Sequence, residues 1–328
     1  MRELTYRDAI REALREEIRR DDRVFIMGED VAVAGGAFNV TQGLLAELGP
    51  ERIFDTPLSE SAIVGAAVGA ALMGMRPVAE VMFADFCTIA MDAIVNHAAK
   101  MHYLYGGEVS APLVLRLAYG GGMRFASHHS QSVESWLTNV PGLTIVMPAT
   151  PADAKGLLKA AIRTPNPVIF LEHKLLYNTK GEVPEGDYLV PIGKADIKRP
   201  GDGVTIVATG LMVDRALGAA RSLAREGISA EVIDLRSIQP LDEETILGSV
   251  EKTGRLVIVH EAPVRGGFGG EVAAVVANKA FGYLDAPIQR VGAPWTPVPF
   301  GPVLEEAYLP KESDIVTAVR SVVGASAG

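Results

Sequence analysis

The alternation of short apolar runs with helical patterns most constrains how this 328-residue chain can fold. Apolar runs occupy 24–27, 78–83, 113–117, 144–147 and 168–171, and helical patterns occupy 61–74, 85–105 and 152–163. Strands that are separated by helices pair in parallel, and the helices then cover both faces of the sheet. We therefore expect a largely parallel sheet in the first half of the chain.

A second series of the same kind follows a change in composition. Glycine, proline and charged residues dominate 178–200, which is typical of a linker. Apolar runs then recur at 204–209, 230–235, 256–260 and 288–291, with helical patterns at 213–226, 242–253, 270–281 and 312–323. The sequence predicts an α/β protein of two doubly wound domains, residues 1–180 and 201–328, joined by a linker at 181–200.

Composition and charge narrow the classes of partner. The chain is 48% hydrophobic and 22% charged, and its net charge of -9 comes from interspersed acids and bases, which disfavours nucleic acid as a partner. Its one cysteine, Cys87, is typical of a reducing compartment. The charged N-terminus is unlike a secretory signal, and the apolar run at 61–75 is shorter than the ~20 residues of a membrane span. We expect a cytoplasmic protein without a membrane partner.

A lone carboxylate, Glu60, precedes the uncharged run at 61–75. Pro57 restricts the approach to this run, and Ser59 is expected to be a helix N-cap. The run lacks a polar face, so we expect Glu60 to be buried, where an unpaired carboxylate takes a proton or finds a partner. Such a group is suited to share a proton with a ligand nitrogen. An ordinary acidic residue at a helix start remains the alternative.

A pair of histidines, His128 and His129, lies beyond a glycine loop at 120–122. The loop follows an expected parallel strand, and ligands bind beyond the carboxyl ends of such strands. The imidazoles could serve acid–base chemistry, or they could simply be solvated loop residues. A metal site is disfavoured because no companion set of ligands has the required spacing.

Two glycine-rich segments resemble cofactor motifs but have simpler interpretations. Gly201-Asp202-Gly203 could begin a magnesium-diphosphate motif, but the stretch at 227–234 contains no asparagine ligand, so we expect a turn. The glycines at 266–270 lack the spacing of a phosphate-binding loop, and close packing of a strand-to-helix connection is the better interpretation.

Taken together, several segments resemble the beta subunit of the thiamine-diphosphate-dependent decarboxylase component of 2-oxo acid dehydrogenase complexes. They are 28–30, 55–60, 129–131, 153–158, 231–236 and 252–256, and the similarity extends from about residue 5 to about residue 310. The resemblance implies a transketolase-like pyrimidine-binding domain followed by a transketolase C-terminal-like domain. It also implies an alpha subunit partner in an α2β2 heterotetramer and a dihydrolipoyl acyltransferase core.

The resemblance also implies how the site is shared. The alpha subunit would hold the diphosphate and magnesium, and this chain would hold the aminopyrimidine of thiamine diphosphate. Glu60 matches the glutamate that hydrogen-bonds the pyrimidine N1′, so that the imino tautomer can take the C2 proton. Phe86 matches the aromatic residue that stacks on the pyrimidine, and Met82 lines the same pocket. His129 matches the histidine that faces the substrate and the lipoyl group, whereas His128 has no assigned role.

Some relatives bind potassium through backbone carbonyls. The corresponding positions in this chain are Leu113, Ala161, Ile162, Thr164 and Asn166. Thr164 stands where some members have an acidic residue, which leaves the potassium site open.

The activity implied is oxidative decarboxylation of a 2-oxo acid with reductive acylation of lipoyl groups, as in pyruvate dehydrogenase. The segments 172–177 and 296–300 are similar to acetoin dehydrogenase beta subunits, so the substrate stays open. Two further alternatives are a split transketolase-type subunit and a non-catalytic interaction subunit. The presence of both Glu60 and His129 disfavours the non-catalytic alternative.

Overall fold

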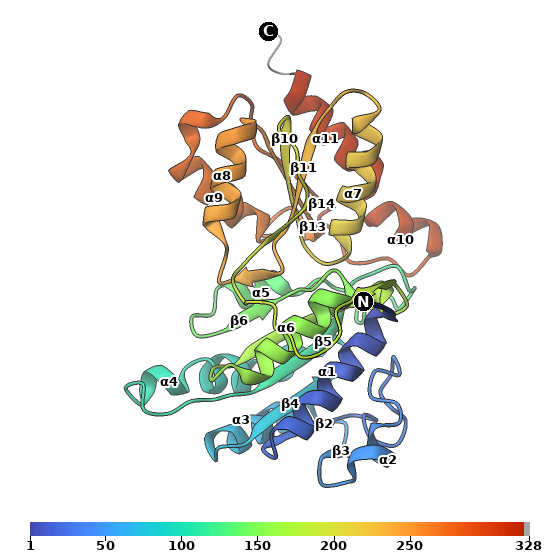
Figure 1. The fold of residues 1–328 in the computed structure, drawn as a ribbon, viewed down its shortest axis with the longest axis vertical. Coiled ribbons are helices and arrows are strands. Elements are labelled where there is room, and N and C mark those ends of the chain that lie inside the picture. The colour runs from blue at the N-terminus through green and yellow to red at the C-terminus, as the bar shows by residue number, and fades with distance from the viewer. Residues whose placement is uncertain (325–328) are drawn as a thin grey trace. The chain divides into compact units, whose positions relative to one another are not determined.

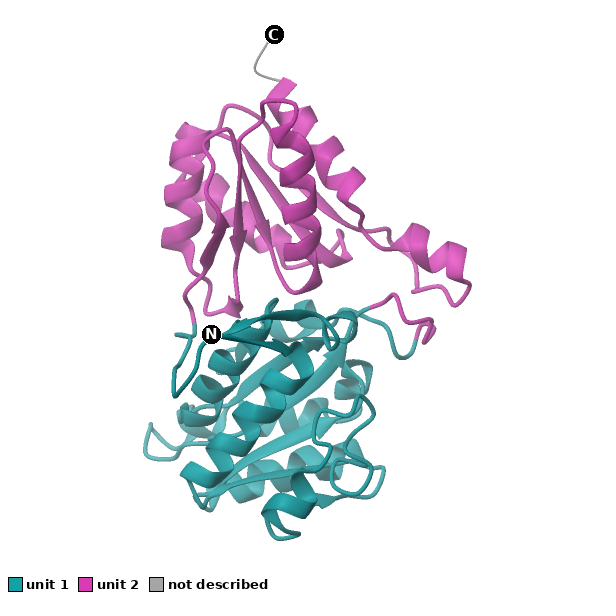
Figure 2. Cartoon of the chain, turned by 45° about the vertical axis from the view of Figure 1, so that its right-hand side comes forward, with its two compact units in different colours: residues 1–120, 128–192 teal, residues 121–127, 193–328 magenta. Residues whose placement is uncertain are grey.

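The computed structural model describes residues 1–324 and divides the chain into two compact units. Unit 1 comprises residues 1–120 and 128–192, and unit 2 comprises residues 121–127 and those from 193 onward (Figure 2). Each unit has a largely parallel sheet with packed helices, so the predicted fold class is confirmed. None of the helices within 1–324 is both long and apolar enough to span a membrane.

The strands of unit 1 lie in the order β6-β7-β5-β4-β2-β3 and pair in parallel. Their bounds are β2 (Val24–Gly28), β3 (Ile53–Asp55), β4 (Arg76–Val81), β5 (Val114–Tyr119), β6 (Thr144–Val146) and β7 (Val168–His173). The residues of β2, β5 and β7 are all buried, as expected for central parallel strands. All of these carboxyl ends therefore face the same edge of the sheet.

Helices α1 (Tyr6–Arg20) and α6 (Pro151–Arg163) pack against each other over this sheet (Figure 1). The hydroxyl of Thr5 accepts a hydrogen bond from the Asp8 amide and caps α1. Helix α3 (Glu60–Leu72) packs against β4.

The helix expected over 85–105 is broken into three pieces. They are the 3-10 turn η1 (Ala84–Thr88), the π-helical segment η2 (Ala93–Ala98) and α4 (Met101–Leu104). The hydroxyl of Thr88 donates to the Asp85 carbonyl at 2.9 Å, and β-branched Ile89 ends the turn. Helical spacing of apolar residues alone did not reveal this local competition for the backbone.

The segment 181–200, expected to be a linker, contains regular structure. β8 (Lys180–Val183) pairs antiparallel with β1 (Arg2–Thr5), and β9 (Asp196–Arg199) pairs antiparallel with β11 (Ala230–Asp234). Both are short strands among glycine and proline, and their partners are distant in sequence. Local composition therefore could not indicate them.

The sheet of unit 2 has the order β14-β13-β10-β11-β9, with β10 (Val204–Ala208), β13 (Leu256–Pro263) and β14 (Gln289–Ala293) in parallel with β11. Helices α7 (Leu211–Ala224) and α11 (Glu312–Gly324) cover one face, and α8 (Glu243–Thr253) and α9 (Gly269–Lys279) cover the other (Figure 1). The shorter elements are α2 (Leu44–Leu48), α5 (Glu134–Thr138), η3 (Lys174–Leu176), β12 (Ser237–Gln239), η4 (Phe281–Tyr283) and α10 (Pro302–Tyr308).

The glycine-rich segment before α9 packs around a buried histidine. A Cβ atom on Gly267 would lie 2.3 Å from Cε1 of His260, and one on Gly269 would lie 2.7 Å from its Cδ2. These glycines are therefore needed for close packing, as the sequence predicted. The other segment, Gly201 to Gly203, forms a turn before β10, which is also as predicted.

Candidate active site

Side chains suited to chemistry follow the carboxyl ends of adjacent strands in unit 1. Glu29 directly follows β2, Met82 directly follows β4, and Gly120 directly follows β5. Because these strands are parallel and adjacent, their carboxyl ends lie at one edge of the sheet, where α/β proteins bind ligands.

Glu60 is the first residue of α3, with Ser59 at the N-cap position. The Ser59 side chain does not form the expected capping hydrogen bond. Glu60 is half-buried, not buried as predicted, because one face of its helix is exposed. The residues on that face are small: Ser61, Ala62, Gly65, Ala66 and Gly69. In this chain alone, the Glu60 carboxylate is therefore at the border of a surface that nothing in residues 1–324 covers.

Glu29 is a site residue to which the sequence reasoning gave no role. It is only 4% exposed, and its Oε1 atom is buried without a hydrogen-bond partner within residues 1–324. Burial raises the pKa of Glu29, and the carboxylates of Glu60, Asp30 and Glu80 raise it further. The signal in the sequence was a carboxylate directly after an apolar strand.

A buried arginine balances the acids deeper in the sheet. The Arg116 guanidinium forms two hydrogen bonds with Glu172, from Nε to Oε1 at 2.6 Å and from Nη2 to Oε2 at 2.7 Å. It also donates to Glu80, and the Tyr177 hydroxyl donates to Glu172 at 2.8 Å. Burial raises the pKa of Glu80, although the Arg116 charge opposes this shift. Within residues 1–324, Glu29 has no such cationic partner, which distinguishes it from these structural carboxylates.

His129 lies against two aromatic rings. Its ring centroid is 4.6 Å from that of Phe83 and 5.3 Å from that of Phe86, with both pairs close to perpendicular. Lys174 donates a hydrogen bond to the His129 backbone carbonyl. Neither imidazole nitrogen of His129 has a hydrogen-bond partner among residues 1–324, so both are available to a ligand. The adjacent His128 is exposed.

Helix α3 is bonded directly to the turn that carries Phe86. The Ser61 hydroxyl donates to the Ile89 carbonyl at 2.6 Å, and Ile89 ends η1. Phe86 and Met82 are both half-buried. The structure thus connects Glu60 with the aromatic residues around His129 through adjacent contacts in one unit.

This arrangement can bind a planar nitrogen heterocycle and move a proton to or from it. Glu60 supplies a carboxylate, Phe86 and Met82 supply apolar surface, and His129 supplies a free imidazole. Because its pKa is raised, Glu29 favours its protonated form more than a solvent-exposed glutamate does. Within residues 1–324, no three histidine, cysteine or acidic side chains are grouped as a metal site requires.

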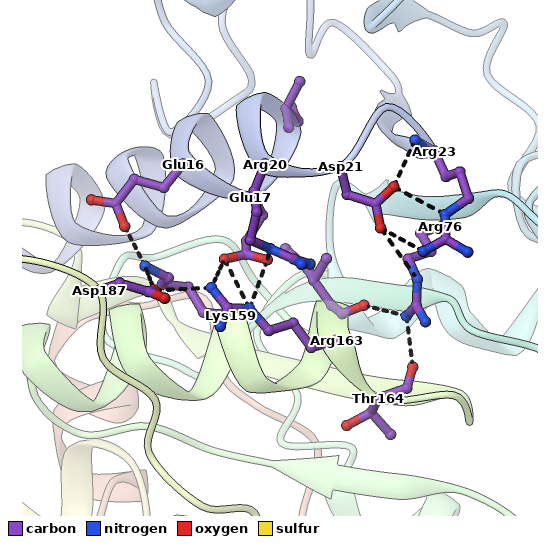
Figure 3. Close-up of polar contacts among 12 residues, drawn as sticks. Glu16, Glu17, Arg20, Asp21, Arg23, Arg76, Lys159, Arg163, Thr164 and Asp187 are labelled. Carbon is purple, nitrogen blue, oxygen red and sulfur yellow. Dashed lines mark hydrogen bonds and ion pairs between the residues drawn. The ribbon is translucent and has the colours of Figure 1, made fainter.

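Four of the five carbonyls predicted to bind potassium accept hydrogen bonds within the chain. The Arg76 Nη1 atom donates to the Ile162 carbonyl at 2.7 Å and to the Thr164 carbonyl at 3.2 Å (Figure 3). The Leu113 carbonyl accepts from the Val168 amide, and the Ala161 carbonyl accepts from the Thr164 amide. A guanidinium beside two of the five positions disfavours a second cation in this conformation.

The chain matches two family descriptions in sequence. Residues 2–180 match the pyrimidine binding domain of transketolase, and residues 193–315 match the transketolase C-terminal domain. A solved chain described as split gene transketolase, inactive beta4 tetramer, has a TM-score of 0.81 and 27% identity, and the match covers 98% of this chain and 99% of that one.

Curated relatives are similar over nearly the full length. The beta subunit of acetoin:2,6-dichlorophenolindophenol oxidoreductase from Cupriavidus necator is 50% identical, covering 98% of both chains. The beta subunit of 2-oxoisovalerate dehydrogenase from Bacillus subtilis is 49% identical, covering 97% of this chain and 98% of that relative. The beta subunit of the pyruvate dehydrogenase E1 component from Rickettsia felis is 48% identical, covering 98% of both chains. The chain therefore belongs to the family of 2-oxo acid and acetoin dehydrogenase beta subunits, which are built from the pyrimidine-binding and C-terminal domains of transketolase.

Proposed function

We propose that this chain forms the aminopyrimidine half of a thiamine diphosphate site and acts with an alpha subunit to decarboxylate a 2-oxo acid oxidatively, passing the acyl group to a lipoyl group. The observation that carries the proposal is the acidic pair at the strand edge: half-buried Glu60 beside buried Glu29, which pairs with no cation in the described part of the chain.

Glu60 would share a proton with the pyrimidine nitrogen. A carboxylate that holds this proton in a site closed to water favours the tautomer needed for deprotonation of the cofactor at C2. Bound thiamine diphosphate supplies the nucleophilic carbon. Glu29 would lie beside the Glu60 carboxylate, whose charge adds to the raised pKa of Glu29.

Phe86 and Met82 would contact the faces of the pyrimidine, and His129 would act on the substrate side. The two aromatic contacts of His129 leave its nitrogens free to exchange a proton. We assign this residue to a step after C2 deprotonation, in which the acyl group is transferred to the lipoyl sulfur.

An alpha subunit would complete the site. The exposed face of α3 supports this: Cβ atoms built on Gly65 and Gly69 meet nothing within 4 Å, so nothing within residues 1–324 requires glycine there. Leu58 and Met73 flank the helix and are 82% and 84% exposed. We expect a closely packed α2β2 contact on this face, which would also bury Glu60. The diphosphate and magnesium would be held by the alpha subunit, and a dihydrolipoyl acyltransferase core would receive the acyl group.

The isolated chain is expected to be inactive and to associate with itself. The solved relative is a beta-chain tetramer described as inactive. The exposed small-residue face of α3 is where we expect this chain to self-associate when the alpha subunit is absent.

The substrate is the open part of the proposal. Acetoin is a second candidate, because the relative with 50% identity is named for it. The test is to mix the chain with its alpha subunit and to measure reduction of an artificial acceptor with pyruvate, branched-chain 2-oxo acids and acetoin in turn. We expect one class of substrate to be preferred. No activity with any of them, despite cofactor binding, would contradict the proposed reaction.

A potassium site at Leu113, Ala161, Ile162, Thr164 and Asn166 stays a weaker proposal. It would require Arg76 to share or leave the carbonyls of Ile162 and Thr164. Potassium at equal ionic strength should raise the melting temperature over sodium if the site exists, and equal melting curves would exclude a stabilising site.

A further inference from the structure

We propose that Asp85 is a positioning residue for His129. Asp85 would hold the loop that carries this histidine and so fix where its imidazole lies, without touching substrate or cofactor itself. The inference rests on the proposed role of His129 and extends it to a residue that the reaction does not contact.

Asp85 forms hydrogen bonds with Gln131, which lies in the loop two residues beyond His129. One of its carboxylate oxygens, Oδ1, accepts both the Gln131 backbone amide at 3.2 Å and the Gln131 side-chain Nε2 at 2.8 Å. Hydrogen bonds to a carboxylate are stronger than those between neutral groups. The backbone and the side chain of Gln131 are therefore both fixed by one acceptor.

A second hydrogen bond is made to the backbone of His129 itself. Lys174 is buried at the start of η3, directly after β7, and donates to the His129 carbonyl. Its Nζ atom also lies 5.4 Å from the centroid of the Phe83 ring. Asp85 follows β4, so residues 129 and 131 are held from the ends of two different strands.

Lys174 thus holds the His129 backbone directly, and Asp85 holds the loop two residues further on. The His129 imidazole has no hydrogen bond within residues 1–324, and its ring contacts are with Phe83 and Phe86. Each such aromatic contact is worth about 0.5–1.5 kcal/mol, which leaves the ring free to move if its backbone moves. An imidazole that must keep both nitrogens available to a ligand has to be positioned through its backbone.

The fold alone does not account for a carboxylate at this position. Asp85 is 5% exposed, and its second oxygen, Oδ2, is buried without a hydrogen-bond partner in the described part of the chain. The neighbouring Ser130 Oγ is buried without a partner as well. Unpaired buried polar atoms lower stability, so a residue without a second buried oxygen would be more stable in a purely structural turn.

The first test measures how firmly Asp85 holds the loop, and it does not depend on enzyme activity. Hydrogen–deuterium exchange should be faster in a peptide covering 128–133 of Asp85→Ala, and near wild type in Asp85→Asn, which keeps one acceptor oxygen. Thr88→Val is the matched control: it loses one hydrogen bond to the Asp85 backbone in the same turn and should leave that peptide protected. Unchanged exchange in Asp85→Ala, on the chain alone and assembled with the alpha subunit, would overturn the inference.

The second test uses the assembled enzyme. Asp85→Ala should slow acyl transfer to lipoamide by about 10- to 100-fold, because a misplacement of about 1 Å can cost that much, while C2 exchange of the cofactor stays within about threefold of wild type. Asp85→Asn should restore transfer. The double variant Asp85→Ala/His129→Ala should be no slower than His129→Ala, since a positioning residue has nothing left to position.

The outcomes separate the inference from the function on which it rests. Normal transfer in His129→Ala would overturn the proposed role of His129 and this inference with it. Impaired transfer in His129→Ala but not in Asp85→Ala would overturn the inference alone. Additive losses in the double variant, or equal loss of C2 exchange and transfer in Asp85→Ala, would show a general structural role instead of positioning.

Discussion

Two groups of acidic residues in unit 1 have opposite surroundings. Between α1 and α6, each acid faces a cation (Figure 3): Glu17 pairs with Arg163, and Glu16 and Asp187 both pair with Lys159. Hydrogen bonds from Lys159 and Arg163 lower the pKa of Asp187 to about 2. These charges balance one another and join the two helices.

At the strand edge, Glu29 pairs with no cation within residues 1–324, whereas its neighbour Glu80 pairs with Arg116. Burial raises the pKa of Glu29, and the charges that add to this shift are those of Glu60, Asp30 and Glu80. The same residue type thus forms ion pairs in one group, and in the other we propose that it takes part in proton transfer. The difference lies in the partners, which is why only the three-dimensional contacts separate the two groups.

The largest effect is expected at Glu60. Glu60→Gln should slow C2 hydrogen–deuterium exchange of the bound cofactor by about 10⁴-fold, because an amide cannot share the proton. Quenched-exchange NMR on the α–β assembly measures this rate directly. Glu16→Gln, an acid from the balanced group, should leave the exchange unchanged. A rate within about threefold of wild type in Glu60→Gln would mean that another group activates the cofactor.

His129 is expected to act later than Glu60. His129→Ala should lower acyl transfer to lipoamide by about 10²-fold or more with C2 exchange largely intact. His128→Ala is the control and should do much less, because that side chain is exposed. An assay with an artificial acceptor, which bypasses the lipoyl group, then shows whether decarboxylation or acyl transfer is impaired. Equal losses in the two variants would refute the assignment.

The balanced group should contribute to stability and not to rate. Lys159→Met is expected to lower the free energy of unfolding by about 2 kcal/mol, less than for a fully buried pair, because Glu16 and Asp187 are 34% and 61% exposed. Urea denaturation measures the change. Lys180→Met removes an exposed pair with Glu3 and should cost about 0.5 kcal/mol or less. Equal losses in both variants would contradict a special role for this group.

The smallest effect has the opposite sign. Because the folded state raises the Glu29 pKa, its proton stays bound to higher pH than in the unfolded chain, and stability is lost as pH rises through the raised pKa. Glu29→Gln should remove this loss and stabilise the chain above that pH by about 1 kcal/mol, an effect limited by solvent screening. Glu17→Gln should destabilise it. Unfolding curves between pH 4 and pH 8 measure both effects. Destabilisation in both variants would contradict the difference drawn between the two groups of acids.

Much of the fold could be read from the sequence, because parallel strands are buried on both faces and appear as short apolar runs. The runs at 24–27, 113–117 and 168–171 correspond to β2, β5 and β7. The strands β8 and β9 were missed because pairing with distant partners, not local composition, stabilises them. The prediction of one helix over 85–105 was wrong because side chains such as Thr88 compete for the hydrogen bonds of the backbone there.

The site was predicted less completely than the fold. Glu60 and His129 could be singled out from their neighbours in sequence, but the half-exposed state of Glu60 depends on a helix face that remains open in this chain. Glu29 and Asp85 acquire their roles from contacts with residues far along the chain, which no local pattern encodes.

The central claim is that this chain holds the aminopyrimidine and needs an alpha subunit to hold the diphosphate. Calorimetric titration of thiamine diphosphate with magnesium, into the chain alone and into its mixture with the alpha subunit, tests it most directly. The account predicts no tight binding by the chain alone and micromolar binding by the mixture. Micromolar, magnesium-dependent binding by the isolated chain would contradict it.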